Sequence, residues 1–100
     1  MALLPELFDA VTAQRLGLVN WVVPAAELAA QTQRTAVRLA QGPTRAYAES
    51  KRLLNQSLER SLETQMEEEL QAFARCAVTE DLAEGVAAFV EKRKPVFKGK

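Results

Sequence analysis

Hydrophobic positions recur with helical spacing over most of the chain. The clearest case is residues 62–77, where apolar side chains follow one another at intervals of three or four residues, as on one face of an amphipathic helix (Leu62, Met66, Leu70, Phe73 and Ala77). Weaker patterns of the same period predict one helix between Pro24 and Gly42, one from about Thr44 to Leu58, and one after Thr79 with the apolar positions Leu82, Val86, Phe89 and Val90. The chain therefore reads as a mostly α protein with four or five helices.

The ends of these helices are marked by typical residues. Thr12 is expected to cap a short helix that ends at Leu16, with Gly17 supplying the left-handed residue. Pro24 is placed to start the next helix, and Gly42-Pro43 to end it. Either Ser57 or Ser61 can cap the helix over residues 62–77, and Thr79 the last one. Gly85, inside that last helix, indicates close packing of a neighbouring segment.

One segment has the pattern of a strand. Residues 18–23 are mainly β-branched or apolar and lie between Gly17 and Pro24. A single strand leaves its backbone groups unpaired, so the segment is either the last strand of a sheet whose other strands lie outside this sequence or an extended linker. We therefore divide the chain into residues 1–23, a remnant of a core domain, and residues 24–100, a helical domain.

Composition and charge narrow the functional classes. The 100 residues have a net charge of zero, and nothing in them matches a secretory leader or a membrane-spanning helix, so we expect a soluble, cytoplasmic protein with no membrane partner. Residues 91–100 hold five basic side chains and one acidic one, so the rest of the chain is acidic. Such a local basic tail favours one specific anionic contact over nucleic-acid binding, although a merely solvated tail has the same composition.

Catalytic and metal-binding patterns are missing from the sequence. There is no histidine, the single cysteine is Cys76, and the four glycines are scattered. A nucleophile–histidine pair, a histidine-based metal site and a glycine-rich phosphate loop are thus excluded. Cys76 is expected to be a buried small hydrophobe. The adjacent carboxylates Glu67, Glu68 and Glu69 point about 100° apart on a helix and are expected to be solvated, with Glu68–Arg75 and Arg60–Glu63 as weak ion pairs.

Three stretches in register resemble the crotonase superfamily, the enoyl-CoA hydratases and isomerases. They are Phe8-Asp9-Ala10 with Leu16-Gly17-Leu18-Val19-Asn20, then Gly42-Pro43-Thr44 with Ser50-Lys51-Arg52, then residues 79–100 with Glu84-Gly85 and Glu91-Lys92-Arg93-Lys94-Pro95. Gly42-Pro43-Thr44 and residues 63–65 look most like the phenylacetate-pathway branch. The resemblance implies the C-terminal helical trimerisation domain of such an enzyme, without its β-spiral core.

The resemblance also implies a function. The parent enzyme would act on acyl-CoA thioesters, as a homo-oligomer whose C-terminal helices cover the active site, with coenzyme A as part of the substrate and no other cofactor. No catalytic residue and no metal ligand is carried over, so we expect the 100 residues alone to be inactive. Phe89 and Lys92 match the family positions that approach the adenosine end of coenzyme A, and their i,i+3 spacing places them on one helical face. The alternatives are a core Phe89 with a solvated Lys92, and a stand-alone helical interaction module without ligand.

Overall fold

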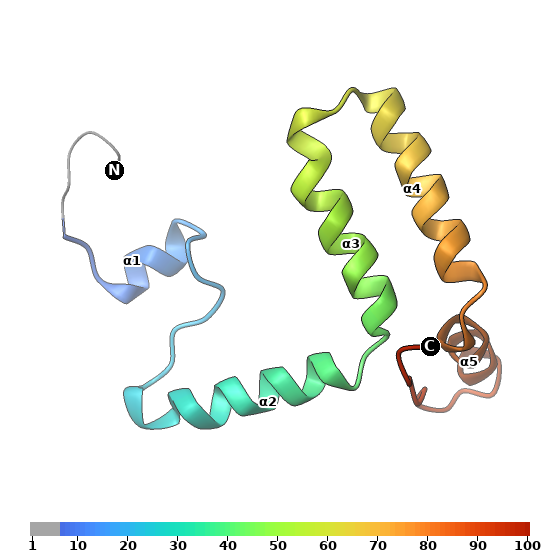
Figure 1. The fold of residues 1–100 in the computed structure, drawn as a ribbon. Coiled ribbons are helices and arrows are strands. Elements are labelled where there is room, and N and C mark those ends of the chain that lie inside the picture. Colours follow the sequence, from blue (N-terminus) through green and yellow to red (C-terminus); the bar gives the residue numbers. More distant parts are fainter. Residues whose placement is uncertain (1–6) are drawn as a thin grey trace. The chain divides into compact units, whose positions relative to one another are not determined.

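Helices make up all the regular structure that the computed structural model describes, which covers residues 7–100. The elements are α1 (Ala10–Arg15), α2 (Leu28–Ala40), α3 (Thr44–Gln56), α4 (Leu62–Ala77) and α5 (Glu80–Val90), with 3-10 turns at Ala25–Glu27 and Ser57–Glu59 (Figure 1). The predicted mostly α class is confirmed. Contacts divide the chain after Thr35, inside α2, and the two units are taken separately below.

The first unit contains α1 and an extended segment. Asp9 caps α1 by accepting a hydrogen bond from the N–H of Thr12 at 2.8 Å, so the predicted cap at Thr12 is wrong by one turn. Asp9 is itself a strong capping residue, and Thr12 supplies the donor rather than the acceptor. Gly17 has φ +74, the left-handed conformation expected after the helix.

The predicted strand over residues 18–23 does not form among the described residues. That segment is neither helical nor paired with another strand. The side chain of Gln14 donates to the carbonyl of Asn20 at 3.2 Å, which ties the segment back to α1. The physical reason is the one that made the strand doubtful, because an extended segment without a neighbouring strand has no ladder to join.

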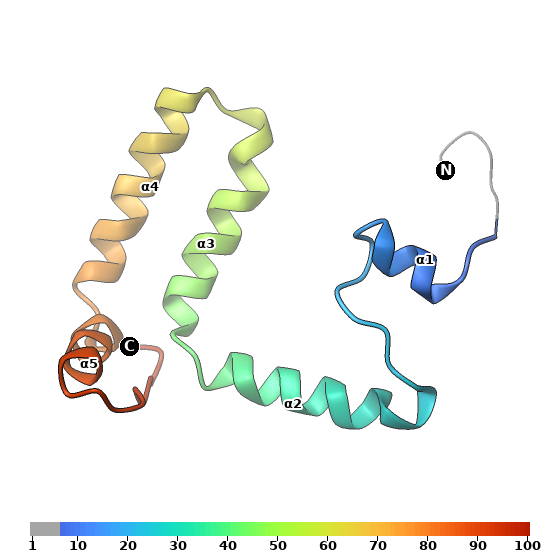
Figure 2. The same ribbon diagram turned by 180° about the vertical axis from the view of Figure 1, so that it is seen from behind.

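In the second unit, α3 and α4 lie side by side and run in opposite directions, and we call this pair the α3–α4 hairpin (Figures 1 and 2). The turn between them contains the 3-10 residues Ser57–Glu59. Ser61, and not Ser57, caps α4, since its hydroxyl accepts from the N–H of Thr64 at 3.2 Å. This cap thus fixes where the second helix of the hairpin starts.

Thr79 joins α4 to α5. Its hydroxyl donates to the carbonyl of Cys76 at 2.7 Å and accepts from the N–H of Leu82 at 3.2 Å. One side chain therefore satisfies an orphan carbonyl at the end of α4 and an orphan N–H at the start of α5. This cap was predicted, and the structure confirms it.

Apolar burial is sparse in the described part of the chain. Only Ala72 and Ala88 are buried hydrophobic residues there. The predicted apolar face of α4 forms as a helix face, but its large side chains are exposed: we call Leu62, Met66, Leu70 and Phe73 the apolar stripe, and they are 59–71% exposed. The stripe does not face α3, because the α4 residues turned toward α3 are the smaller or polar ones. A contiguous exposed row of large apolar side chains is typical of an interaction surface.

Candidate functional site

The two residues predicted to bind coenzyme A lie at the end of α5. Phe89 is in the last turn of the helix and is 85% exposed. Lys92 lies beyond the helix, because α5 ends at Val90 and Glu91 is the C-cap. The prediction that Phe89 and Lys92 share one helical face is therefore wrong, although both lie at the same end of the same helix. The alternative, in which Phe89 is a core residue, is also wrong for the described residues, because its side chain is exposed.

Lys92 has the conformation that ends many helices. Its φ is +54, in the left-handed region. The N–H of Lys92 donates to the carbonyl of Phe89 at 3.3 Å, and the N–H of Arg93 donates to that of Ala88 at 3.0 Å. These two bonds form a Schellman motif, in which glycine is the usual left-handed residue. A lysine there has a backbone cost on the order of 1–2 kcal/mol, so the surrounding contacts must hold it.

Those contacts come from residues 91–100, which fold back along α5 and which we call the C-terminal strap (Figure 1). Asp81 accepts the N–H of Lys98 at 2.7 Å and that of Gly99 at 2.9 Å, one on each carboxylate oxygen. Glu84 accepts the N–H of Val96 at 2.8 Å. Asp81 is only 5% exposed. Two carboxylates one turn apart on α5 thus bind the backbone of the strap.

Arg93 adds the charged part of this attachment. Its guanidinium binds both carboxylate oxygens of Glu84, at 2.6 and 2.8 Å, and also donates to Glu91. Paired, two-bond contacts between arginine and a carboxylate are strong and directional. The Arg93 guanidinium, together with the Val96 N–H, lowers the pKa of Glu84 from 4.5 to about 2. Glu84 is therefore ionised near neutral pH and is unsuited to act there as a proton carrier.

Two glycines lie where the strap contacts the helices. The ring of Phe97 is placed so that a Cβ at Gly85 would meet it at 3.6 Å, which is ordinary van der Waals contact. Gly99 has φ +72, and a Cβ there would come within 2.6 Å of the Thr44 hydroxyl oxygen, at the start of α3. The predicted neighbour of Gly85 is present, but the contact leaves room for a Cβ, so the packing is not close enough to require a glycine. The neighbours of these glycines were not predicted from the sequence: Phe97 beside Gly85, and Thr44 and Asp81 beside Gly99.

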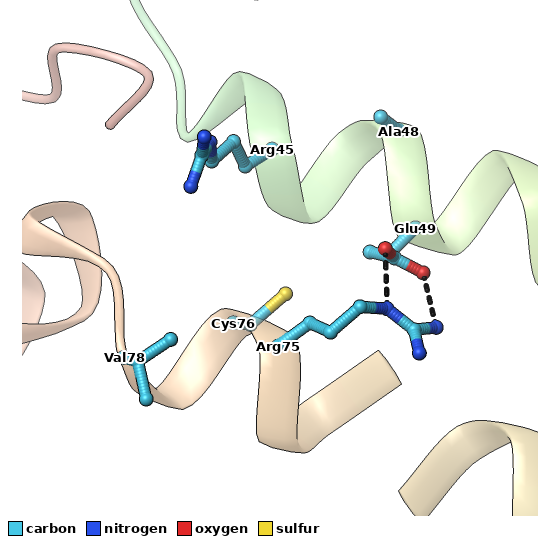
Figure 3. A pocket seen from close by; sticks show the side chains of 6 residues that line it. All are labelled: Arg45, Ala48, Glu49, Arg75, Cys76 and Val78. Atoms are coloured by element: carbon cyan, nitrogen blue, oxygen red, sulfur yellow. Dashed lines mark hydrogen bonds and ion pairs between the residues drawn. The ribbon is translucent and has the colours of Figure 1, made fainter. Parts of the chain in front are cut away.

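A second candidate place is an open cavity of about 440 Å³ at the α3–α4 hairpin, lined by six residues (Arg45, Ala48, Glu49, Arg75, Cys76 and Val78) (Figure 3). Arg75 reaches from α4 to α3 and binds the two oxygens of Glu49, both at 2.9 Å. Cys76 is partly exposed and lines this cavity, so the prediction that it is buried is wrong.

Charged pairs hold the facing sides of the hairpin. Arg52 donates to Glu68 at 2.8 Å, and Arg60 lies 3.7 Å from the same carboxylate. The predicted Glu68–Arg75 and Arg60–Glu63 pairs are replaced by these, because Glu68 faces α3 and Arg75 is occupied by Glu49. The Arg75 guanidinium lowers the pKa of Glu49 to about 2. A carboxylate that is fixed and ionised in this way stabilises the hairpin but cannot serve as a general base near neutral pH.

The described residues assemble neither a metal cluster nor a nucleophile with a base. Among residues 7–100, no three cysteine, aspartate or glutamate side chains are arranged to hold a metal ion. A search of the same residues for a helix long and apolar enough to cross a membrane found none. What the arrangement offers is an exposed aromatic ring and a cation at the end of α5, and an exposed apolar stripe on α4.

Comparison with known proteins gives one consistent result. Residues 1–100 match the enoyl-CoA hydratase/isomerase family. The 2,3-dehydroadipyl-CoA hydratase of Escherichia coli K12 is 37% identical over 100 residues, all of this chain and 39% of that protein. The crotonyl-CoA hydratase of Syntrophomonas wolfei is 36% identical over 92 residues, 92% of this chain and 35% of that protein. The chain thus spans less than two fifths of the length of these relatives.

Solved structures agree with the sequence relatives. An enoyl-CoA hydratase from Geobacillus kaustophilus matches with a TM-score of 0.87 and 34% identity, over 95% of this chain and 36% of that one. An enoyl-CoA hydratase from Bacillus anthracis matches with a TM-score of 0.81 and 33% identity, over 91% of this chain and 35% of that one. At these identities the likeness is more than one of fold. The chain belongs to the enoyl-CoA hydratase/isomerase family, as its three sequence stretches predicted.

Proposed function

We propose that this chain is the C-terminal helical part of an enzyme that acts on acyl-CoA thioesters, where it joins subunits and covers the active site. The family assignment and the relatives named as hydratases of CoA esters support the reaction class. The chain matches only a little over a third of each relative, which leaves the larger part of such an enzyme outside these residues.

The observation that carries the proposal is the exposed apolar stripe on α4. Leu62, Met66, Leu70 and Phe73 follow one helix face for its full length, yet α3 packs elsewhere. Burying a large apolar side chain contributes about 1.5–3 kcal/mol, so four in a row are a substantial binding surface. A helical segment with this surface is suited to packing against a core domain or another subunit.

The chemistry itself belongs to residues outside this chain. Hydration or isomerisation of an acyl-CoA needs backbone N–H groups that stabilise the enolate oxygen, and carboxylates that move protons. The best-placed carboxylates among the described residues, Glu49 and Glu84, are fixed by Arg75 and Arg93. We therefore propose that the 100 residues alone do not hydrate an acyl-CoA.

A chimera tests this proposal. The part of the E. coli 2,3-dehydroadipyl-CoA hydratase that precedes the matched region is joined to residues 1–100, and hydration of an enoyl-CoA is measured. We expect the chimera to be active, and neither that preceding part alone nor the 100 residues alone to be. Activity of the isolated 100 residues would contradict the proposal, as would an active preceding part that gains nothing from the chain.

We further propose that Phe89 and Lys92 contact the adenosine end of coenzyme A. Phe89 offers an exposed ring that can stack on adenine, and Lys92 a cation that can pair with phosphate. In the chimera, Lys92→Met removes the charge, and Lys92→Gly removes it while suiting the left-handed turn. Both should raise KM about tenfold with little change in kcat, because the contact is remote from the reacting carbons.

A substrate truncated at the pantetheine provides the control. It lacks the nucleotide, so the two variants should handle it as the unmodified chimera does. An equal rise in KM for the intact and truncated substrates would mean that Lys92 acts structurally. The homo-oligomer, the cytoplasmic location, the division at residue 23 and the phenylacetate-pathway branch stay predictions.

A further inference from the structure

The conformation of Lys92 depends on contacts that are made elsewhere in the strap. A lysine with φ +54 is not held by its own preference, and the Schellman bonds are local to the helix end. The strap is fixed further along by Asp81, in the first turn of α5, and by Glu84, one turn later. Because the chain must return to these carboxylates directly after α5 ends, a sharp reversal is required close to Lys92.

We propose that Asp81 and Glu84 are positioning residues that latch the C-terminal strap and thereby fix the left-handed turn and the ammonium of Lys92. As far as Lys92 meets substrate, the inference rests on the proposed function. The latch itself rests on contacts within this chain alone. Asp81 and Glu84 occupy neighbouring turns of one helix face, and each accepts at least one backbone N–H of the strap.

The latch has three attachment points in chain order. Arg93 is bound through both oxygens of Glu84, directly after Lys92. Val96 is bound through its N–H to the same carboxylate. Lys98 and Gly99 are bound to the buried Asp81, whose own N–H donates to the carbonyl of Lys100 at 3.1 Å. Asp81 and Glu84 are the acceptors for these strap N–H groups. Replacing both carboxylates should therefore release the strap at Arg93 and Val96 and also at Lys98 and Gly99.

The position of Asp81 strengthens the latch. Thr79 is the N-cap of α5, so Asp81 is in the first turn, where the partial positive charge of the helix N-terminus favours a carboxylate. Burial of Asp81 to 5% exposure keeps water from competing for its two N–H donors. The strap is thus attached both directly after Lys92, through Arg93, and at its remote end, through Asp81, so the turn at Lys92 lies in a segment that is fixed at both ends.

The test is a pair of variants in the full 100-residue chain, read by NMR. Asp81→Asn combined with Glu84→Gln keeps side-chain shape and removes both charges. We expect amide exchange at Val96, Lys98 and Gly99 to become at least about tenfold faster, as for hydrogen bonds lost to a charged acceptor. The three-bond N–H to Hα coupling of Lys92 should shift from its left-handed value to a conformational average. Glu80→Gln, the same chemical change on the neighbouring residue, is the matched control and should alter neither.

Amides of α3 and α4 serve as the internal reference for folding. If they too lose protection, the decisive variant becomes Gly99→Ala, which disturbs the strap from outside α5 through its φ of +72 and the nearby Thr44 hydroxyl. It should speed exchange at Lys98 and shift the Lys92 coupling in the same sense. A Lys92 coupling that stays left-handed while the strap amides open would overturn the inference.

The functional consequence is read separately in the active chimera. The double variant should raise KM for the acyl-CoA about as much as Lys92→Met does and leave KM for the pantetheine substrate unchanged. Glu84→Asp, which keeps the charge, should restore part of the loss relative to Glu84→Gln. An opened strap with a mobile Lys92 and an unchanged KM would refute the substrate contact proposed for Lys92, while the positioning of Lys92 by the latch would stand.

Discussion

The α3–α4 hairpin and the C-terminal strap are both held by polar contacts, but the contacts differ in kind: side-chain ion pairs in the hairpin, and mainly backbone N–H groups bound by carboxylates in the strap. The hairpin places charged pairs such as Arg75–Glu49 and Arg52–Glu68 between its helices and leaves its large apolar side chains outside. The strap is held to α5 by hydrogen bonds from its backbone N–H groups to Asp81 and Glu84, and the aromatic ring of Phe97 lies against Gly85.

The difference shows which region needs a partner. Every attachment of the strap has both of its members in this chain. Both helices expose large apolar side chains, Leu62, Met66, Leu70 and Phe73 on α4 and Val86, Phe89 and Val90 on α5, and water disfavours such surface. The ion pairs of the hairpin are partly exposed and contribute little to stability, so they do not compensate for the surface on α4. The hairpin is thus expected to bind another protein surface, whereas the attachment of the strap to α5 is expected to persist without one.

The largest expected effect breaks the hairpin side of this comparison. Alone at micromolar concentration, the 100 residues should self-associate through the apolar stripe and sediment faster than a monomer. Leu70→Glu combined with Phe73→Glu should convert the chain to a monomer, because burying two charges costs far more than the association gains. Analytical ultracentrifugation measures both states.

Gln71→Glu provides the matched control for the stripe. It adds a charge to the same helix between the two substituted positions, on an exposed residue outside the stripe. It should leave the association intact. An unmodified chain that sediments as a monomer, or a double variant that still associates, would show that the stripe is not the interaction surface.

Acid should weaken the hairpin and the strap in the same pH window. Single substitutions should then separate the contributions of the two regions. Arg75 and Arg93 depress the pKa values of Glu49 and Glu84 to about 2. A carboxylate with a depressed folded pKa stabilises the fold fully above its unfolded value near 4.5, and this contribution is lost as the pH falls toward 2. Glu49→Gln should reduce the pH dependence of the hairpin amides only, because Arg52 also lowers the pKa of Glu68 and that contribution remains. Glu84→Gln should reduce the pH dependence of the strap amides only, as followed by amide exchange. Loss of both together would mean that the two regions open as one.

The smallest expected effect concerns the glycine under Phe97. Gly85→Ala adds a Cβ at 3.6 Å from the ring, an ordinary contact, and improves the helix propensity of α5. We expect stability to rise by at most about 1 kcal/mol, measured by urea unfolding. Gly99→Ala makes the same chemical change at a φ of +72 and should lower stability instead. A destabilising Gly85→Ala would show that Phe97 packs more tightly than this contact.

Helix positions were the part of the fold that the sequence could predict. The period of α4 and the cap at Thr79 are local signals and were predicted correctly, and Ser61 was one of two candidate caps. The cap of α1 was misplaced because Asp9 and Thr12 are both suitable capping residues.

Which face of α4 is buried was not a local question. It depends on α3, which presents Glu49 and Arg52 rather than apolar side chains. The segment after Gly17 was ambiguous for a related reason, since a strand is defined by its neighbour.

The binding role of Phe89 and Lys92 stays a prediction, but the structure does show how the two residues lie. Phe89 is in the last turn of α5, and Lys92 follows the C-cap residue Glu91. The prediction that Phe89 and Lys92 share one helical face was wrong because no residue before Pro95 indicates that α5 ends at Val90. The role of Asp81 was missed because a carboxylate in the first turn of a helix is explained by the helix alone. Its second role, as an acceptor for Lys98 and Gly99, requires a contact across seventeen residues.

The bond between the carbonyl of Lys100 and the N–H of Asp81 has a practical consequence for handling the protein. An affinity tag attached directly after Lys100 would begin inside a folded segment and beside a buried carboxylate. A flexible spacer or a tag at the other end of the chain avoids this. Deleting Lys100 would likewise remove a residue whose backbone is bonded to α5, so residues 98–100 are a poor place to shorten the chain.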